Sequence, residues 1–599
     1  MRYSVEELAN LLEQNQPEGS ALVDKKKIKE NAVNPFFAGE VQKLKAVAED
    51  AAAHPSVVLP FSEYRIFDTE GSRDLYEPNY LKRRMRLNAL VFMELILDDG
   101  TYLKAIEDEI WVWLNEYSWA IPASMQGDSL KPSGWNGVPQ EKYLDLCSTE
   151  MAYTLAEIDA LMGEKLAPLI RYRMKQEVFR RVLDSYMGPA RFGWESCDNN
   201  WAAVCGGSVG AAAIYYVEDS KELAKYLVRV LDTMDCFLSG YDSDGACVEG
   251  VSYWSYGFSY YIFFSELLKQ RTNGAVDLLA EEKVHQMALF LQRCRIEKNQ
   301  VINFSDCAGY FTYRVGMLHK LKERYPDVLI PPAEYTMRFH DDHCYRWPGF
   351  IRDYMWFDSS FMDKFEDKLE NGHFFQESQV YLSRKNGAFF AVAGGHNGYS
   401  HNHNDLGHFI YHAQGESVLI DIGQGIYTKE YFSEGRYNII NNSARGHSVP
   451  QINGCLQMEG PEHCVRAMDV QNGDTDMVKM DLSKAYDCPA LDGLIRTFVF
   501  RPDGSLELTD RFTLKQQSAI LEQFVVDITE EPKIADGQVI LVKNEAKLTL
   551  KFDEKLQFKG IEKIPGSVMA RNQSDGLRII QFISENLTQS VDFRFHISF

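Results

Sequence analysis

A short stretch of the chain, "GGHNGYSHNHNDLGHFIYH" from Gly394 to His412, holds five of the fourteen histidines. Its HNHND core places His401 and His403 one residue apart, and on a β-strand this spacing turns both side chains to one face. Imidazole titrates near neutral pH and also binds divalent metals, so the cluster suits acid–base chemistry, metal binding or both. A polar surface loop is the simpler alternative, and other residues must decide.

Two downstream segments supply further candidate metal ligands. Asp421 ends the apolar stretch "VLIDIG", and His447 follows the polar loop "NSARGHS". Two imidazoles and one carboxylate, from His403, Asp421 and His447, suit Zn²⁺ or another divalent ion such as Mn²⁺. We therefore predict one divalent ion per chain, although a strand-end aspartate and an unrelated loop histidine would leave the same pattern.

The segment "WESCDNNWAAVCGG" places Asp198, Asn199, Asn200 and Trp201 at an expected helix start. Aspartate and asparagine are favoured N-cap residues, so one of them is expected to cap this helix. Two adjacent amides before a tryptophan exceed what a cap needs. We therefore regard this segment as a candidate binding site.

A second segment, "DGACVEGVSYWSYGFSYY", offers Glu249, Tyr253 and Tyr256 at the entry to a helix. Residues three apart share a helix face, so both tyrosines could line one cleft. Aromatic residues at helical spacing are more often part of a core, and this alternative stays open.

Two kinds of hydrophobic period divide the chain. Up to residue 335, apolar residues recur at helical spacing in segments such as "YLKRRMRLNALVFMELILDD" and "ELAKYLVRVLDTMDCFLSG". Many helices in succession predict an all-α domain, 1–335, built from antiparallel pairs. Beyond a transition at 336–375, alternating or β-branched segments separated by NG and PDG turns predict an antiparallel β-sandwich over 376–599.

Composition narrows the classes of function. The net charge of −23 argues against nucleic acid and anionic membrane surfaces as partners, yet a local cluster of cationic groups can still hold a small anionic substrate. No apolar run is long enough to span a bilayer. The N-terminus resembles an amphipathic helix more than a signal peptide, and eleven scattered cysteines suggest free thiols, so we expect a cytoplasmic protein.

The motifs together resemble the heparinase II/III-like polysaccharide lyases. "NNW" and "EGVSYWSYG" fall in the helical part, and "SHNHNDLGHF", "LIDIGQGIY" and "ARGHS" fall in the β part, so the resemblance spans most of the chain. It implies an α/α toroid followed by a β-sandwich, and cleavage of uronic-acid glycans by β-elimination to 4,5-unsaturated uronyl products. Some members carry a histidine directly after the paired asparagines, where this chain has Trp201.

The resemblance also implies residue roles. Asn200 would neutralise the substrate carboxylate, Tyr256 would be the catalytic tyrosine with Tyr253 as the alternative register, and His401 would be the catalytic imidazole. The metal ligands would be His403, Asp421 and His447, and the ion would be structural, fixing the loops that hold His401. The residues expected to contact the substrate are Asn199, Trp201, Glu249, Trp135 and Arg436.

The residue types suit this reaction. Removal of the C5 proton next to an ionised carboxylate requires that the site hydrogen-bond that carboxylate, which an amide can do. For a glucuronate, one tyrosine could act as base and acid, although a tyrosine base needs its pKa lowered by nearby positive charge. For an iduronate, the proton and the leaving group lie on opposite faces, so His401 would be the base and the tyrosine the acid.

Two other classes of function remain open. A glycoside hydrolase acting on unsaturated uronyl oligosaccharides needs carboxylates in the cleft, for which Asp198 and Glu249 are candidates. A non-catalytic carbohydrate-binding protein would stack sugars on tryptophans. Among lyase substrates the glycosaminoglycans heparan sulfate, chondroitin sulfate and hyaluronan are favoured, with alginate as the alternative. The tryptophans considered for stacking are Trp119, Trp135, Trp201 and Trp254.

Overall fold

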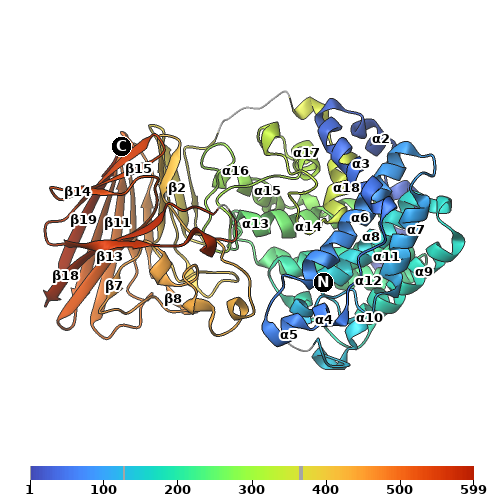
Figure 1. Cartoon of the computed structure of the whole chain (residues 1–599), viewed down its shortest axis with the longest axis horizontal. Helices are drawn as coiled ribbons and strands as arrows, with labels where there is room; N and C mark the ends of the chain where they lie inside the picture. The colour runs from blue at the N-terminus through green and yellow to red at the C-terminus, as the bar shows by residue number, and fades with distance from the viewer. Residues whose placement is uncertain (1, 126–128, 363–368, 572) are drawn as a thin grey trace. The chain divides into compact units, whose positions relative to one another are not determined.

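The computed structural model describes residues 2–125, 129–362, 369–571 and 573–599, and at Trp135 the backbone alone. The chain forms two compact units (Figure 1). We call the first, which comprises Met1–Tyr241, Trp254–Ala288 and Thr312–Glu366, the helical unit. We call the second, which comprises Asp242–Tyr253, Leu289–Phe311 and Asp367–Phe599, the sheet unit.

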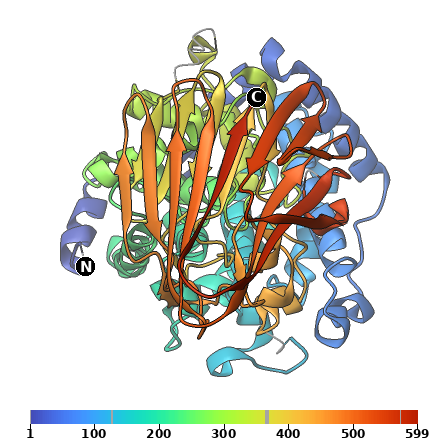
Figure 2. The same cartoon turned by 90° about the vertical axis from the view of Figure 1, so that its left-hand side faces the viewer.

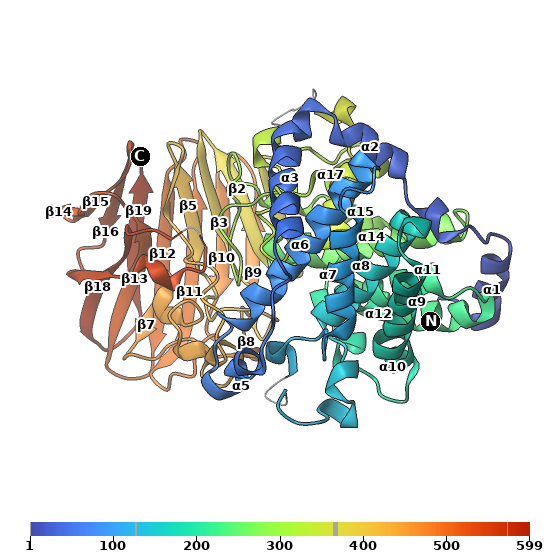
Figure 3. The same ribbon diagram turned by 45° about the vertical axis from the view of Figure 1, so that its right-hand side comes forward.

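Antiparallel helix pairs build the helical unit. Short turns join α6 to α7 and α11 to α12, and the members of each pair pack on each other (Figure 3). Among the described residues, no helix has the length and apolar character needed to cross a membrane. The main helices are α1 (Val5–Glu13), α2 (Lys25–Ala32), α3 (Ala38–Ala53), α6 (Tyr76–Leu97), α7 (Leu103–Asn115), α8 (Leu146–Met162), α9 (Pro168–Val178), α11 (Asn200–Tyr216), α12 (Ser220–Ser239), α14 (Ser259–Arg271), α17 (Val315–Arg324) and α18 (Trp347–Met355).

Helix α11 lies at the centre of this unit, in contact with α8, α12 and α14. Its run of alanines and glycines lets the neighbouring helices approach closely. A Cβ at Gly210 would lie 2.4 Å from the ring of Phe264, and one at Gly207 would lie 3.1 Å from the carbonyl oxygen of Tyr260. Close packing therefore fixes the middle of α11, the helix that begins at Asn200.

The sheet unit is a sandwich of antiparallel sheets (Figure 2). Phe390 of one sheet meets Phe498 of the other at 5.0 Å between ring centroids, and Phe524 meets Phe595 at 4.7 Å. One sheet has the order β1 (Gly372–Phe375), β2 (Val380–Lys385), β3 (Ala388–Val392), β5 (Phe409–Ala413), β6 (Glu416–Leu419), β13 (Ser518–Asp527), β18 (Leu577–Leu587), β17 (Gln557–Lys563), with β7 (Gln451–Ile452) also paired to β13. The other has the order β14 (Lys533–Ala535), β15 (Gln538–Lys543), β16 (Ala546–Phe552), β19 (Val591–Ser598), β12 (Leu506–Leu514), β11 (Leu491–Phe500), β10 (Asp476–Asp481), β9 (Met468–Gln471).

The main boundary between the units, at 366/367, lies inside the transition predicted at 336–375. The helical unit continues through α18, and β1 begins at Gly372. Two earlier segments, Asp242–Tyr253 and Leu289–Phe311, belong to the sheet unit. Their partners lie about a hundred residues away in the sequence, so local periodicity does not reveal the association. Both segments carry residues of the candidate site.

Candidate active site

The carboxylate of Asp306, on the segment Leu289–Phe311 of the sheet unit, joins the two histidines of the HNHND core. His401 Nδ1 lies 2.8 Å from Asp306 Oδ2, and His403 Nε2 lies 3.1 Å from Asp306 Oδ1. The HNHND residues form a turn and a loop, so the one-face argument that applies to a strand does not apply here. Both imidazoles nevertheless face one group, because Asp306 lies between them.

Three more donors hold Asp306 in place. Arg436 Nη2 donates to its Oδ2 at 3.1 Å, the Tyr427 hydroxyl donates to Oδ2 at 3.2 Å, and the Tyr431 hydroxyl donates to Oδ1. Burial alone would raise the pKa of Asp306, but hydrogen bonds from His401 and His403 and the charge of Arg436 hold it well below its usual range. Asp306 is therefore a fixed anion.

The Asp306 carboxylate determines which nitrogen of His401 is available for chemistry. A carboxylate can only accept, so the Nδ1–H of neutral His401 donates to it and Nε2 keeps the lone pair. His401 Nε2 lies 3.7 Å from Glu249 Oε1, and the ring is 15 % exposed. The backbone of His401 has φ +57°, a left-handed conformation that is uncommon outside glycine and often found at functional sites.

Tyr253, not Tyr256, lies with His401. The Tyr253 and His401 rings stack at 4.2 Å between centroids, and the two hydroxyl oxygens of Tyr253 and Tyr427 are 2.5 Å apart. Because Tyr427 donates to Asp306, Tyr253 donates to Tyr427 in this network. Burial, followed by the negative charge of Asp306, raises the pKa of Tyr253 far above its usual value. Tyr253 is therefore held as a neutral phenol.

Tyr256 has a different set of partners, all within the helical unit. Its hydroxyl donates to Glu150 Oε1 at 2.8 Å, as does the hydroxyl of Tyr260, and Arg346 lies over its ring at 4.0 Å. Burial and the charge of Glu150 raise its pKa well above the usual value. The two tyrosines do not share the environment expected from α-helical spacing, since residues Trp254–Phe258 form a π-helix.

The two asparagines at the start of α11 have different hydrogen-bonding environments. Asn199 is the N-cap, and its Oδ1 accepts from the backbone N–H of Trp201 at 3.1 Å. Asn200 is 3 % exposed, and its Oδ1 is buried without a hydrogen-bond partner among the described residues. Gly257 packs against Asn200, where a Cβ would meet the Asn200 Cβ at 3.0 Å. The fold therefore leaves the Oδ1 acceptor of Asn200 unused.

The structure brings the three predicted metal ligands together and adds a fourth. One donor atom from each of His403, Asp405, Asp421 and His447 lies within 4.8 Å of the others, and all four residues are buried. Three of these atoms, His403 Nδ1, Asp421 Oδ2 and His447 Nδ1, have no hydrogen-bond partner among the described residues. His447 Nδ1 and Asp421 Oδ2 lie 3.5 Å apart, and the imidazole and carboxylate donors of this set are the types that divalent metals prefer.

Neighbouring groups orient these donors toward one point. His403 Nε2 faces Asp306, and His447 Nε2 faces the carbonyl oxygen of Asn441 at 2.8 Å, so in the neutral form each histidine presents Nδ1 as a lone pair. The Gly423 N–H donates to Asp421 Oδ1 at 2.6 Å, while Oδ2 faces His447 Nδ1 at 3.5 Å and His408 Nε2 at 3.4 Å. Gly423 has φ +62°, and a Cβ there would lie 2.4 Å from a backbone oxygen, which explains the glycine of "DIG".

His408, a fifth polar residue beside this group, supports it without joining it. Its Nδ1 accepts from the Ser448 N–H at 2.8 Å, so neutral His408 carries its proton on Nε2, which faces Asp421 Oδ2 at 3.4 Å. Burial lowers the pKa of His408 to about 3, so the ring is neutral at pH 7. A protonated Nε2 cannot bind a metal, so His408 is no candidate ligand, and its Nε2–H lies toward the Asp421 carboxylate.

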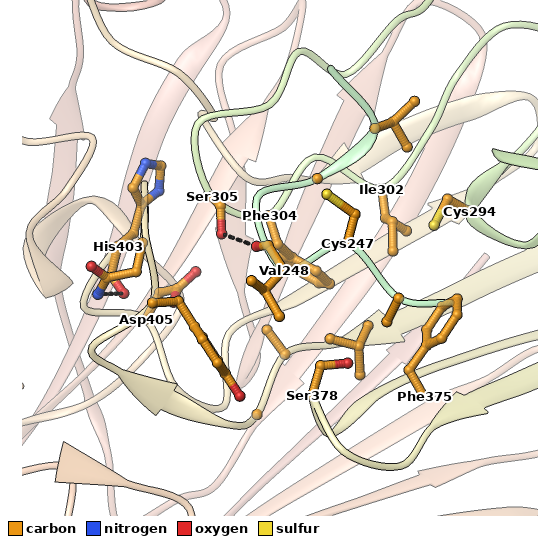
Figure 4. A pocket seen from close by; sticks show the side chains of 18 of the residues that line it. Cys247, Val248, Cys294, Ile302, Phe304, Ser305, Phe375, Ser378, His403 and Asp405 are labelled. Atoms are coloured by element: carbon orange, nitrogen blue, oxygen red, sulfur yellow. Dashed lines mark hydrogen bonds between the residues drawn. The ribbon is translucent and has the colours of Figure 1, made fainter. Parts of the chain in front are cut away.

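We call the four candidate metal ligands His403, Asp405, Asp421 and His447 the metal group. A cavity of about 70 Å³ in the sheet unit adjoins it (Figure 4). His403 and Asp405 line one end, whereas Cys247, Ile302 and Phe304 line the apolar remainder. An apolar wall of this kind limits the access of water to the donor atoms.

The tryptophans considered for sugar stacking divide into core and surface residues. Trp119 and Trp254 are 1 % and 2 % exposed, and their indole N–H groups donate to the backbone oxygens of Trp113 and Met287. Both are core residues, so the stacking role considered for them is wrong. Trp201 is half-buried, and the side chain of Trp135 lies outside what the structure describes. The exposed aromatic residue near His401 is Phe432, at 56 % exposure and 6.3 Å between ring centroids.

Sequence reasoning missed Asp306, Asp405, Tyr427 and Tyr431. Asp405 was visible as the last residue of the HNHND core, and a histidine pair generally needs a carboxylate partner. Nothing in "NFSDCAG" marks Asp306 as that partner, because the segment joins the sheet unit only in the folded chain.

No protein-family model matches the chain, and no curated protein matches it in sequence. Its fold is nevertheless shared with solved structures. Heparinase III matches at a TM-score of 0.64 and 12 % identity, over 96 % of this chain and 93 % of that one. A mutant heparan sulfate lyase from Pedobacter heparinus matches at 0.62 and 12 %, over 99 % and 87 %.

Chondroitin AC lyase from Streptomyces coelicolor A3 matches at 0.58 and 11 %, over 97 % of this chain and 82 % of that one. The chain has the fold of these lyases. The predicted fold class, an α/α helical domain followed by an antiparallel β-sandwich, is thereby confirmed. At 11–12 % identity the similarity concerns the fold, and the chemistry must be argued from the residues of this chain.

Proposed function

We propose that the chain is a polysaccharide lyase that cleaves uronic-acid-containing glycans by β-elimination. The observation that carries the proposal is the cluster of His401, Tyr253 and Asp306, which presents a free imidazole nitrogen beside a neutral phenol. A base and an acid in contact are what this elimination needs. The lyase fold is the setting in which the cluster occurs.

His401 is the proposed base. Its Nε2 would take the C5 proton of the uronate, the C4–O4 bond would break, and a C4=C5 double bond would form. The resulting imidazolium would have Asp306 at Nδ1 and Glu249 near Nε2, so both carboxylates would stabilise the charge that develops. This arrangement supports a catalytic role for His401.

Tyr253 is the proposed acid, in place of Tyr256. The leaving O4 needs a proton, which a neutral phenol can supply, whereas a tyrosine base would need a lowered pKa. Both tyrosine hydroxyls have partners, Tyr427 for Tyr253 and Glu150 for Tyr256, and Tyr253 is preferred because its ring stacks on His401. His401 and Tyr253 stack on each other, so they would approach the sugar from one side, which fits a glucuronate, whose proton and leaving group lie on one face.

Two side chains are proposed for substrate binding. Asn200 would donate from its Nδ2–H2 group to the uronate carboxylate, as one donor to a developing anion. In the sheet unit, exposed Phe432 would stack on a sugar ring. Arg436 is bound to Asp306 and acts through it, so we propose a positioning role for Arg436 in place of direct substrate contact.

The proposed substrates are glycosaminoglycans or their oligosaccharides. The structures that share the fold include enzymes named for heparan sulfate and chondroitin, one of them in complex with chondroitin sulphate. Alginate is the second candidate polymer.

A divalent ion, Zn²⁺ or Mn²⁺, fits the group formed by His403, Asp405, Asp421 and His447. The fit rests on unpaired donor atoms and on nitrogens oriented by their neighbours. When bound, the ion would supply a fixed positive charge that cross-links the loops carrying these residues. Its proposed role is structural, because it would fix the loop that ends in His401.

The other two classes are less well supported. A glycoside hydrolase needs two carboxylates in one cleft, and the two considered for it, Asp198 and Glu249, belong to different units of the chain. A non-catalytic binder would need exposed tryptophans for sugar stacking, but Trp119 and Trp254 are buried in the core.

Ultraviolet absorbance separates the three classes. A lyase creates a conjugated double bond, a hydrolase of unsaturated ends removes one, and a binder does neither. We expect absorbance to rise when the protein is incubated with at least one of heparan sulfate, chondroitin sulfate, hyaluronan and alginate. A fall in absorbance with unsaturated oligosaccharides would support the hydrolase, and no change with any polymer would contradict the proposal.

A further inference from the structure

We infer that Asp306 couples the metal group to the catalytic imidazole, so that metal binding and the orientation of His401 depend on each other. The inference rests on the proposed function for the catalytic role of His401. The expected dependence of metal binding on Asp306 rests on the geometry alone. The coupling element is one carboxylate whose two oxygens serve two histidines.

The first step is the state of the two rings. Asp306 Oδ1 accepts from His403 Nε2, which leaves His403 Nδ1 for the metal. Asp306 Oδ2 accepts from His401 Nδ1, which leaves His401 Nε2 for the substrate. Replacing the carboxylate by an amide offers one acceptor oxygen at most, so one of the two rings would lose its partner.

The second step is the stiffness of the connection. Asp306 is 0 % exposed, and Tyr431 and Arg436 donate to it from a separate loop. Arg436 Nη2 also donates to the backbone oxygen of Asn402 at 2.9 Å, so it holds the residue between the two histidines. A displacement of His403 is therefore transmitted to His401 by the carboxylate and by the backbone.

The third step is reciprocity. If the metal favours one arrangement of His403, Asp306 and His401, then perturbing Asp306 must weaken metal binding as well as catalysis. Replacement of a residue that only filled space would not specifically weaken metal binding or catalysis. Asp306 is thus a positioning residue for both sites.

The first test uses Asp306→Asn, with Asp353→Asn as the matched control. Asp353 is a buried aspartate of the helical unit, paired with Arg314 at 2.8 Å, so its replacement reports the general cost of losing a buried carboxylate. Metal affinity is measured by competition of Zn²⁺ or Mn²⁺ with a chromogenic chelator. We expect Asp306→Asn to weaken binding about 10–100-fold, the range for lost partners of metal-bound histidines, and Asp353→Asn to leave it unchanged.

Kinetics on a cleaved polymer give the second readout. We expect Asp306→Asn to lower kcat by about 10²–10⁴-fold with little change in KM, since loss of an orienting carboxylate in a serine-protease triad costs about 10⁴. Metal affinity within twofold of the wild type, or equal losses in Asp306→Asn and Asp353→Asn, would overturn the inference. If the wild type cleaves no polymer, the proposed function fails, while the affinity measurement still decides the coupling.

A third measurement avoids substitution of Asp306. Protein labelled with ¹⁵N-histidine reports the protonated nitrogen of each ring, and His401→Ala assigns the His401 signals by their loss. We expect removal of the ion from the wild type by a chelator to shift or broaden the signals of His401. Unchanged His401 signals after removal of the ion would contradict the coupling even if Asp306→Asn failed to fold.

Discussion

Removal of one proposed metal ligand should destabilise the protein by an amount that follows from linkage. His447→Ala removes an imidazole whose Nδ1 is buried and unpaired and leaves the remaining donors of His403 and Asp421 without their common cation. An ion that binds only the folded state, at a free concentration 1,000 times Kd, contributes about 4 kcal/mol. In domains of about 150–250 residues, 1 kcal/mol shifts Tm by about 2–4 °C. Loss of the ion should therefore lower the Tm of the sheet unit by about 8–16 °C.

Calorimetry and elemental analysis test this together. We expect one Zn²⁺ or Mn²⁺ per wild-type chain. A chelator should lower the Tm of the wild type by about 8–16 °C and should leave the Tm of His447→Ala unchanged. His412→Ala is the matched control, because His412 is a buried histidine bonded to Ser417 and Glu297 and lies outside the group. An absence of stoichiometric metal in active protein, with equal Tm values in the presence and absence of the chelator, would refute the metal site.

Three further results are expected. Asn200→Ala should lower kcat about 10²-fold or more with the fold intact by circular dichroism, the scale for loss of one donor to a developing oxyanion; near-normal kcat would contradict the role of Asn200. Phe432→Ala should raise KM more than it lowers kcat in steady-state assays, because the ring is exposed and lies beside His401 rather than in the reacting cluster. Burial lowers the pKa of His319 to about 4, so its contribution to stability is full above the unfolded pKa near 6.5 and is lost as pH falls toward 4. His319→Gln should therefore flatten the decline of Tm over that interval in calorimetric scans, and an unchanged decline would contradict the assignment.

The sequence predicted the fold well because its signals are local. Helical periodicity marks α6 and α12, and alternation marks strands such as β11, where buried and less buried residues follow each other. The segments Asp242–Tyr253 and Leu289–Phe311 carry no such period, and their association with the sheet unit depends on contacts far along the chain. A single boundary between two domains could therefore not be drawn correctly from periodicity.

The site was predicted in part for the same reason. His401 and His403 stand out as a pair in the sequence, and the structure brings His403 together with Asp421 and His447; that they bind a metal stays a prediction. Asp306 was invisible because a single aspartate in a loop has no pattern. The register of the tyrosines could not be settled either, because a π-helix begins between Tyr253 and Tyr256 and changes the angle between side chains.

The central claim is that Tyr253 and His401 perform a β-elimination, and turnover of Tyr253→Phe tests it most directly. The change keeps the ring stacked on His401 and removes only the hydroxyl that would protonate the leaving oxygen. Tyr256→Phe is the control, since its hydroxyl serves Glu150 and its loss should cost about 1 kcal/mol of stability and little turnover. With a polymer that the wild type converts to unsaturated product, we predict that absorbance stays flat for Tyr253→Phe and rises for Tyr256→Phe. A rise for Tyr253→Phe at the wild-type rate would contradict the account.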